Sequence, residues 1–417
     1  MTEQQPKRLG IAEFQAVFDR CSNWGRWGAD DERGTLNFIT PEHRLRAAAL
    51  VREGVPVSCA HPINTMADVD NTFPAQHFML RTGDIVDASP PLSTADHLAV
   101  SPHGVTHSHL DALCHFHWQG RTYNDRPVSL VTSQGARANA ITAGQDGIVS
   151  RGILLDVPRA LGVDWLEPDH AITVAELEQA ESDAGLRVVS GDILLVRTGR
   201  QARRAALGAW NSRLELAGLH HDVPAWLKER EVALLGCDGV SDVRGHAFDL
   251  PITPIHILTL VALGMQLLDN QNLEDLAAAC AQRSRWEFML VIAPLKLIGG
   301  TASMVNPIAL FERTPRPETV AHLEEQARSG RRTVRSPVMS RSHTVRSRAS
   351  GSRRLGGYRM TALAAGGQVS DARAGIGSDF QMREEMLIMS RSVTRQGVSL
   401  STPNPGSSAA PKMGPGS

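Results

Sequence analysis

Four hydrophobic runs between residues 152 and 295 stand out in the pattern of apolar and polar positions. Turn-forming residues such as glycine, proline and aspartate flank these runs. Short continuous apolar runs are typical of strands that are buried on both faces of a sheet. We therefore expect strands at 152–157, 192–199, 232–239 and 287–295.

Segments with helical patterns lie among these runs. Thr173, with Glu176 three residues later, forms a capping box at the start of one of them. Strands and helices alternate without a strict βαβ repeat, and no Gly-x-Gly-x-x-Gly motif follows a strand. The predicted fold class is α/β, with a mixed β-sheet core and flanking helices. Helices are expected at 173–185, 224–231, 254–264 and 272–284.

The composition changes sharply near residue 313. Residues 313–417 are rich in Arg, Ser, Gly and Pro, and the stretch 331–354 carries eight arginines and no acidic residue. Such a segment buries too little apolar surface to offset the entropy lost on ordering. We expect one domain at 1–312 and a largely disordered tail at 313–417. The formal net charge is -1, so nucleic acid is not expected as a partner, except as an alternative role for the arginine-rich tail.

The cysteines and the apolar runs bear on the compartment. Five cysteines, at positions 21, 59, 114, 237 and 280, are widely spaced and form no Cys-x-x-Cys pair, which favours a reducing environment over a disulfide framework. No run approaches the roughly 20 apolar residues of a membrane span, and the first fifteen residues lack the apolar core of a signal peptide. We expect a soluble, cytoplasmic protein without a membrane partner.

The most informative segment is 101–118, SPHGVTHSHLDALCHFHW, which holds five of the sixteen histidines of the chain. Proline, glycine and β-branched residues disfavour a helix in its first half, which we expect to be extended. Alternate residues of a strand share a face, so His107, His109 and Asp111 should point the same way. The following LDALCH is interpreted as a helical turn that brings His115 back over Asp111.

These side chains predict a metal site. Imidazole nitrogen with carboxylate oxygen suits Zn, Mn or Fe, and the absence of thiolates argues against a structural zinc site. Three protein ligands leave an open position where a bound water becomes more acidic. A histidine outside the ligand set can then act as general base and later as general acid.

The segment resembles the cyclase family of metal-dependent hydrolases, which includes bacterial kynurenine formamidase and isatin hydrolase. The motif of that family is His-x-Gly-Thr-His-x-Asp-x-Pro-x-His. Aligned on Asp111, the resemblance implies His109 as the second histidine and His115 as the last. A valine fills the place of the first histidine, and His107, on the same strand face, is expected to replace it. An alternative alignment makes His103 the first histidine but needs two extra residues before Asp111, so His103 is the reserve ligand.

The likeness covers roughly residues 20–312. GILLDV and GDILLVRTG match two core strands of the family, and GCDGVSD resembles an Asp-x-x-Ser-x-Asp stretch whose second aspartate, Asp242, comes one position early. PIHILTLVALGMQLLDN resembles the segment that supplies a later histidine and a glutamate to the site. His256 matches that histidine, and Asp269 stands for the glutamate.

The resemblance implies a Zn²⁺ or Mn²⁺ cofactor and the hydrolysis of an amide, N-formyl or cyclic, in a small substrate of aromatic type, as in kynurenine formamidase. We expect the metal on His107, His109 and Asp111, and the general base and acid at His115. His256 then completes a second metal site, with Asp269 as a further ligand, or orients the first ligands. Family likeness also implies a homodimer or a higher homo-oligomer.

Two other functions stay open at the level of sequence. A metal-dependent cyclase or dehydratase would use the same ligands as the hydrolase. A non-catalytic protein could use the cluster only to hold a metal or a small ligand, because the first histidine is displaced and an aspartate stands for the glutamate.

Overall fold

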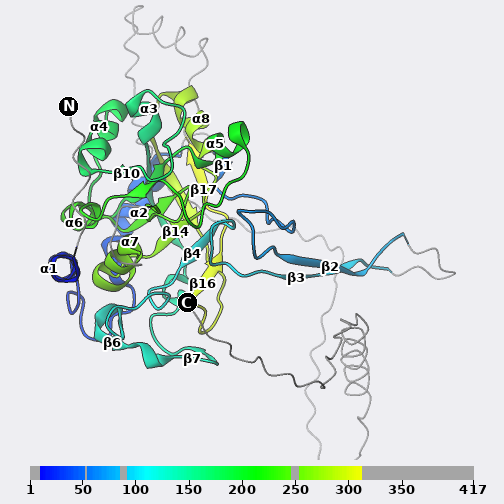
Figure 1. The fold of residues 1–417 in the computed structure, drawn as a ribbon, viewed down its shortest axis with the longest axis horizontal. Helices are drawn as coiled ribbons and strands as arrows, with labels where there is room; N and C mark the ends of the chain where they lie inside the picture. The colour runs from blue at the N-terminus through cyan, green and yellow to red at the C-terminus, as the bar shows by residue number, and fades with distance from the viewer. Residues whose placement is uncertain (1–9, 52–53, 85–91, 246–252, 312–417) are drawn as a thin grey trace, which may run out of the picture. The chain divides into compact units, whose positions relative to one another are not determined.

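The computed structural model describes residues 10–51, 54–84, 92–245 and 253–311 (Figure 1). Within this part of the chain, nine strands form one mixed sheet with flanking helices, which confirms the predicted α/β class. In order across the sheet, the strands are β1 (Val55–Ser58), β17 (Ile308–Phe311), β15 (Glu287–Ile292), β9 (Ile148–Asp156), β11 (Ile193–Arg197), β13 (Leu234–Cys237), β14 (Leu267–Asp269), β4 (His109–Asp111) and β16 (Ala302–Met304).

The four apolar runs of the sequence form β9, β11, β13 and β15, so all four predicted strands are confirmed. β9, β11, β13 and β14 run parallel to one another, whereas β4 and β16 join the sheet antiparallel. The carboxyl ends of β13 and β14 lead to Asp238 and Asp269. Polar residues therefore gather at the edge where ligands bind in open α/β sheets.

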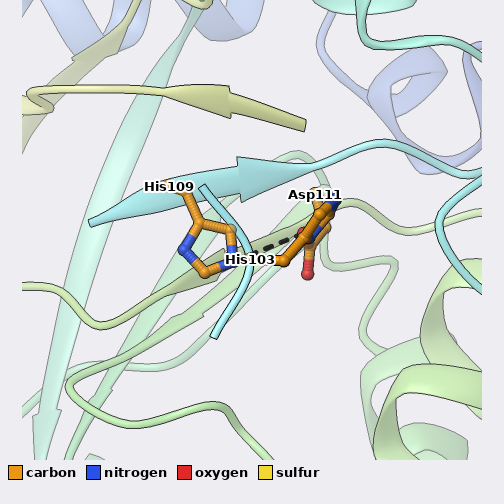
Figure 2. A group of neighbouring side chains, drawn as sticks. All are labelled: His103, His109 and Asp111. Atoms are coloured by element: carbon orange, nitrogen blue, oxygen red, sulfur yellow. Dashed lines mark ion pairs between the residues drawn. The ribbon is translucent and has the colours of Figure 1, made fainter. Parts of the chain in front are cut away.

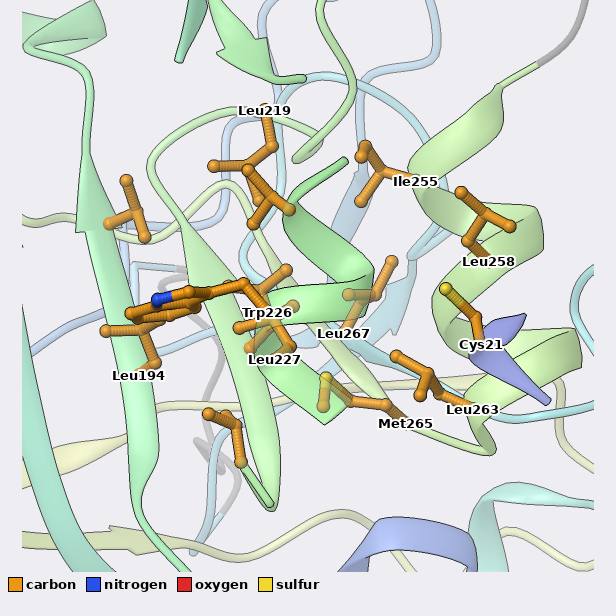
Figure 3. Close-up of a cluster of buried hydrophobic side chains, with 14 of the residues drawn as sticks. Cys21, Leu194, Leu219, Trp226, Leu227, Ile255, Leu258, Leu263, Met265 and Leu267 are labelled. Carbon is orange, nitrogen blue, oxygen red and sulfur yellow. The ribbon is translucent and has the colours of Figure 1, made fainter. Parts of the chain in front are cut away.

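Side chains of the central strands alternate between two hydrophobic cores, one on each face of the sheet. In β11, Leu194 and Val196 belong to one core, and Ile193 and Leu195 belong to the other. Trp226 packs into the first core together with leucines from several elements (Figure 3). Burial on both faces explains why these strands have continuous apolar sequences rather than an alternating pattern.

The helices confirm most of the sequence predictions. Thr173 accepts a hydrogen bond from the N–H of Glu176, and the glutamate side chain bonds back to the Thr173 N–H, so the capping box forms as predicted. The predicted helix at 254–264 begins as an α-helix and continues in the rarer π form. The helices are α1 (Ile11–Cys21), α2 (Pro41–Ala49), α3 (Val157–Leu161), α4 (Val174–Ala184), α5 (Arg200–Leu207), α6 (Val223–Glu229), α7 (Pro254–His256), α8 (Glu274–Arg283), the π-helical η5 (Ile257–Leu263), and the 3₁₀ segments η1 (Gly34–Phe38), η2 (Tyr123–Asp125), η3 (Val128–Leu130) and η4 (Ile141–Gly144).

Smaller elements complete the described part. β2 and β3 form a hairpin whose side chains are mostly exposed. β10 and β12 are parallel, and the other two pairs are antiparallel. The bounds are β2 (Gln76–Arg81), β3 (Ala95–Ala99), β5 (Arg121–Thr122), β6 (Arg126–Pro127), β7 (Val131–Thr132), β8 (Gly135–Ala136), β10 (Ala171–Ile172) and β12 (Gly218–Leu219).

Two glycines bring the N-terminal region against the end of η5. The N–H of Thr35 donates to the carbonyl of Gly264 at 2.9 Å, and the N–H of Asn23 donates to the carbonyl of Ala262 at 2.9 Å. A Cβ on Gly34 would lie 1.8 Å from the carbonyl oxygen of Gly264. The approach therefore requires glycine at position 34, where φ is also positive, at 55°.

The predicted tail at 313–417 lies outside the described residues. No helix in the described ranges is long and apolar enough to cross a membrane. All five cysteines are free and buried.

Candidate metal centre

Strand β4 places the first two side chains of the candidate site. His109 and Asp111 lie on the same face of this three-residue strand, and Leu110 between them packs into the hydrophobic core on the other face. This alternation is the one predicted from the sequence. Asp269 on β14 lies directly opposite His109 in the antiparallel pair, which brings a second carboxylate to the site.

Asp111 is the centre of the cluster. Its side chain is completely buried, yet among the described residues neither carboxylate oxygen accepts a hydrogen bond of good geometry. Four imidazoles surround it instead, two of which Figure 2 shows converging on the carboxylate. The distances to its nearer oxygen are 3.0 Å from His103 Nδ1, 3.4 Å from His109 Nε2, 3.5 Å from His256 Nε2 and 4.0 Å from His115 Nε2.

The second ring nitrogen of two of these imidazoles has its own partner. His103 Nε2 lies 2.9 Å from the hydroxyl of Thr301. His109 Nδ1 lies 2.7 Å from the carbonyl of His107, to which it donates. These outer contacts orient the rings and turn the other nitrogen of each ring toward Asp111, as in histidines that bind metals.

His256 lies among three buried carboxylates. Its Nδ1 is in close contact with Asp242 Oδ2, and its Nε2 lies 3.4 Å from Asp269 Oδ2. Asp242 also accepts hydrogen bonds from the backbone N–H groups of Ile255 and His256, at 2.7 and 3.3 Å. Asp242 therefore fixes both the start of α7 and the orientation of the His256 ring.

The buried carboxylates of the cluster favour positive charge on the groups beside them. Burial disfavours the charged form of His256, but Asp111 and Asp242 outweigh burial and raise its pKa well above the ordinary value. The pKa of His109 is raised as well, because Asp111 outweighs the effect of burial. Buried carboxylates need a compensating cation. Protons on these imidazoles provide it when no metal is bound, and a divalent ion could provide it in their place.

His115 differs from the other imidazoles. Burial lowers its pKa to about 3, so the ring is neutral near pH 7. It stacks on His103 with ring centroids 3.6 Å apart, and its side chain keeps 24% of its surface exposed. The turn after β4 returns His115 toward Asp111, as the sequence predicts, through a hydrogen bond from its N–H to the carbonyl of Ala112 at 3.0 Å.

His107 does not join the cluster. It precedes β4 instead of extending it, and its Nε2 lies 3.2 Å from the carbonyl of Asn64. The expected strand face shared by His107, His109 and Asp111 therefore holds only for the last two. His103, the reserve ligand, contacts Asp111 instead.

Asn270 and Arg200 hold the loop that carries His103. The amide of Asn270 donates to the carbonyls of Gly104 and His107, at 2.8 and 3.2 Å. Arg200 donates to the Asn270 side chain at 2.8 Å and to the carbonyl of Val105. Because both residues are distant in sequence, neither was expected at the site.

The donor set fits a divalent metal ion. Two groups of side chains include Asp111, and within each group the ligand atoms all lie within 4.8 Å of one another. The buried oxygens of Asp111, with imidazole nitrogens around them, are a donor set that suits a divalent metal ion. The two groups are His103, His109 and Asp111, and Asp111, His115 and His256.

The cluster is reachable from the surface. The side chain of His103 is 26% exposed and lines a small cleft together with Phe73, Gly104 and Arg213. Phe116 packs edge-on to His115 and also against His256, with ring centroids 4.8 and 4.7 Å apart. An aromatic side chain thus borders the two imidazoles of the cluster that follow β4 in the chain.

Comparison with known proteins identifies the class. The sequence profile of the Cyclase family matches residues 57–242. A crystal structure of a novel cyclase is 31% identical, with a TM-score of 0.62, and the match covers 69% of this chain and 99% of that chain. No curated protein sequence matches the chain. The chain belongs to the Cyclase family, as its His/Asp motif suggested.

Two further solved structures share parts of the fold at lower identity. An isatin hydrolase bound to the product analogue thioisatinate is 17% identical, with a TM-score of 0.46; the match covers 66% of this chain and 100% of that chain. Isatin hydrolase A from Labrenzia aggregata, bound to benzyl benzoate, is 20% identical, with a TM-score of 0.46; the match covers 64% of this chain and 95% of that chain.

Proposed function

We propose that this chain is a metal-dependent hydrolase that cleaves an amide bond in a small substrate. The observation that carries the proposal is the buried Asp111 carboxylate, which has four imidazoles around it and no hydrogen bond of good geometry among the described residues. His103, His109 and Asp111 would hold the ion, with His256 and Asp269 beside them.

A bound divalent ion would supply a Lewis acid for the amide carbonyl and would lower the pKa of water. The chain supplies the proton transfers. His115 lies beside the cluster and is partly exposed, so it is placed to accept a proton from the attacking water. It returns that proton to the nitrogen as the C–N bond breaks, and the products are a carboxylic acid and an amine.

His256 and Phe116 have supporting roles in this proposal. Asp242 orients His256, whose Nε2 faces Asp111 and Asp269, so His256 orients the ligands or completes a second metal site. The ring of Phe116 borders the site and favours an aromatic substrate over a polar one. An N-formyl or cyclic amide of aromatic type, as in kynurenine formamidase, suits a site that this ring borders.

The test combines metal content with turnover. Elemental analysis of the purified wild type should give at least one equivalent of Zn or Mn, and Asp111→Asn should hold at least one equivalent less than the wild type. His109→Ala should lose the same equivalent together with hydrolysis of N-formyl and cyclic amides, whereas His115→Ala should keep the metal content of the wild type and lose most turnover. A wild-type chain that binds no metal after reconstitution would refute the proposal, and a His115→Ala variant with unchanged turnover would refute the role of His115.

The family name favours a second candidate, a metal-dependent cyclase or dehydratase on the same residues, because the structure with 31% identity is that of a novel cyclase. The two reactions are distinguished by their products, so the substrate screen should follow both hydrolysis and ring closure. Cytoplasmic location and a homo-oligomeric state stay predictions.

A further inference from the structure

A second group of metal-binding side chains lies apart from Asp111. His220, His221 and Asp222 follow β12 and precede α6. Their ligand atoms lie within 4.8 Å of one another, and they share no residue with the groups around Asp111. The sequence offered no reason to assign them a role beyond a surface loop.

The geometry of this group is compact. His220 Nδ1 lies 3.3 Å from one oxygen of Asp222, and His221 Nε2 lies 3.7 Å from the other. The two imidazole rings are in contact, with centroids 3.9 Å apart. The side chains of His220 and His221 keep only 22% and 12% of their surface exposed, whereas that of Asp222 keeps 59%.

The backbone fixes the position of this group. The N–H of His220 donates to the carbonyl of Ile172 at 2.9 Å, and the carbonyl of His220 accepts from the N–H of Val223 at 3.0 Å. Leu219, just before it, donates to the carbonyl of Ser241 at 2.8 Å. Since the loop is tied on both sides, an ion would meet ligands whose backbone is already in place.

Two carboxylates lie near these imidazoles. Asp222 contributes one carboxylate, and Glu13 in the first turn of α1 acts electrostatically on His221. Two imidazoles and a carboxylate are the donor set that suits zinc, copper and nickel, whereas magnesium and calcium prefer oxygen ligands alone.

We propose that His220, His221 and Asp222 form a second metal site, which takes a divalent transition-metal ion of the zinc, nickel or copper class. The ion would stabilise the conformation of the turn between β12 and α6. Through Leu219 and Ser241, this turn adjoins the segment that carries Asp242. The proposal is independent of any catalytic activity at Asp111.

The experiment uses the full chain with Asp111→Asn, which removes the first site. Titration of the metal-free protein with Zn²⁺ in a calorimeter should show one equivalent bound, and a further His220→Ala or His221→Ala substitution should abolish it. With Cu²⁺, the electron paramagnetic resonance spectrum should show coupling to nitrogen in Asp111→Asn and should lose it in the double variants.

The matched control is His77→Ala, because His77 is an exposed histidine that contacts a single carboxylate, Asp96, at 2.9 Å. This variant should bind Zn²⁺ as its parent does. If Asp111→Asn does not fold, the wild type serves, and His220→Ala should lower its zinc stoichiometry by one. An Asp111→Asn chain that binds no Zn²⁺, or a His220→Ala chain that binds as much as its parent, would overturn the proposal.

Discussion

At the scale of single residues, the identity of the first histidine ligand is the sharpest question. His103 Nδ1 lies 3.0 Å from Asp111, whereas His107 contacts the carbonyl of Asn64. We expect His103→Ala to weaken metal binding by at least about tenfold, the effect typical of lost metal-site contacts. His107→Gln, which keeps a donor for the Asn64 carbonyl, should bind metal as the wild type does. Competition with a chelator measures the metal affinity of both variants. A loss of affinity in His107→Gln but not in His103→Ala would restore His107 as the ligand.

Asp242 provides a second prediction at this scale. In Asp242→Asn, the remaining oxygen can still accept a hydrogen bond from the backbone N–H of Ile255. The NH₂ group that replaces the other oxygen can only donate, so it cannot accept a hydrogen bond from His256 Nδ1. The His256 proton would move to Nε2, which faces Asp111 and Asp269. Turnover should fall by about 10- to 100-fold. A variant with full turnover would show that the tautomer of His256 does not matter.

Local patterns predict only some of these residues. His109 and Asp111 follow from strand alternation and His115 from the turn after them, so their convergence was readable from spacing. The contact of His103 with Asp111 could not be predicted from spacing, because Gly104 adopts a positive φ of 131° and the chain before β4 is a loop rather than a strand. Asn270 and Arg200 stabilise this loop from distant elements, and no local pattern reports such contacts.

At the scale of elements, β11 and β13 were predictable because each is a continuous apolar run buried on both faces, and α4 because its capping box is local. The structure of segment 254–264 was only partly predictable. It is mostly apolar, which marks it as buried, but it makes contacts with distant parts of the chain, and no local pattern indicates the change from α7 to the π-helical η5. One such contact is the close approach of Gly34 to Gly264.

This approach gives a prediction about stability. Gly34→Ala places a Cβ 1.8 Å from the carbonyl oxygen of Gly264, so the backbone must shift, at a cost of about 3 kcal/mol or more including the unfavourable φ. The control is Gly162→Ala, which has a similar positive φ of 70° but no atom within 4 Å of the added carbon. It should cost only about 1 kcal/mol. Urea unfolding measures both, and equal losses would mean that the contact is not tight in solution.

At the scale of the whole molecule, the Cyclase family fold accounts for the described residues, and the chain after them is a separate question. β17 pairs with both β1 and β15, and Phe311 at its end is completely buried. A domain cut before β17 would therefore remove the strand that joins β1 to the rest of the sheet. We propose that the domain ends at residue 312 and that the arginine-rich segment 313–417 is a tail, because its composition provides little apolar surface for a core.

Truncation tests this boundary directly. A chain that ends after residue 312 should keep the metal content of the full chain and melt within about 2 °C of it, a shift that corresponds to less than about 1 kcal/mol in a domain of this size. A chain that ends after residue 305 loses β17 and the buried Phe311, and should fail to fold. Circular dichroism and elemental analysis of the three chains decide between these outcomes. If the chain ending after residue 312 unfolds as readily as the shorter one, the tail contributes to the core, and the boundary drawn from composition is wrong.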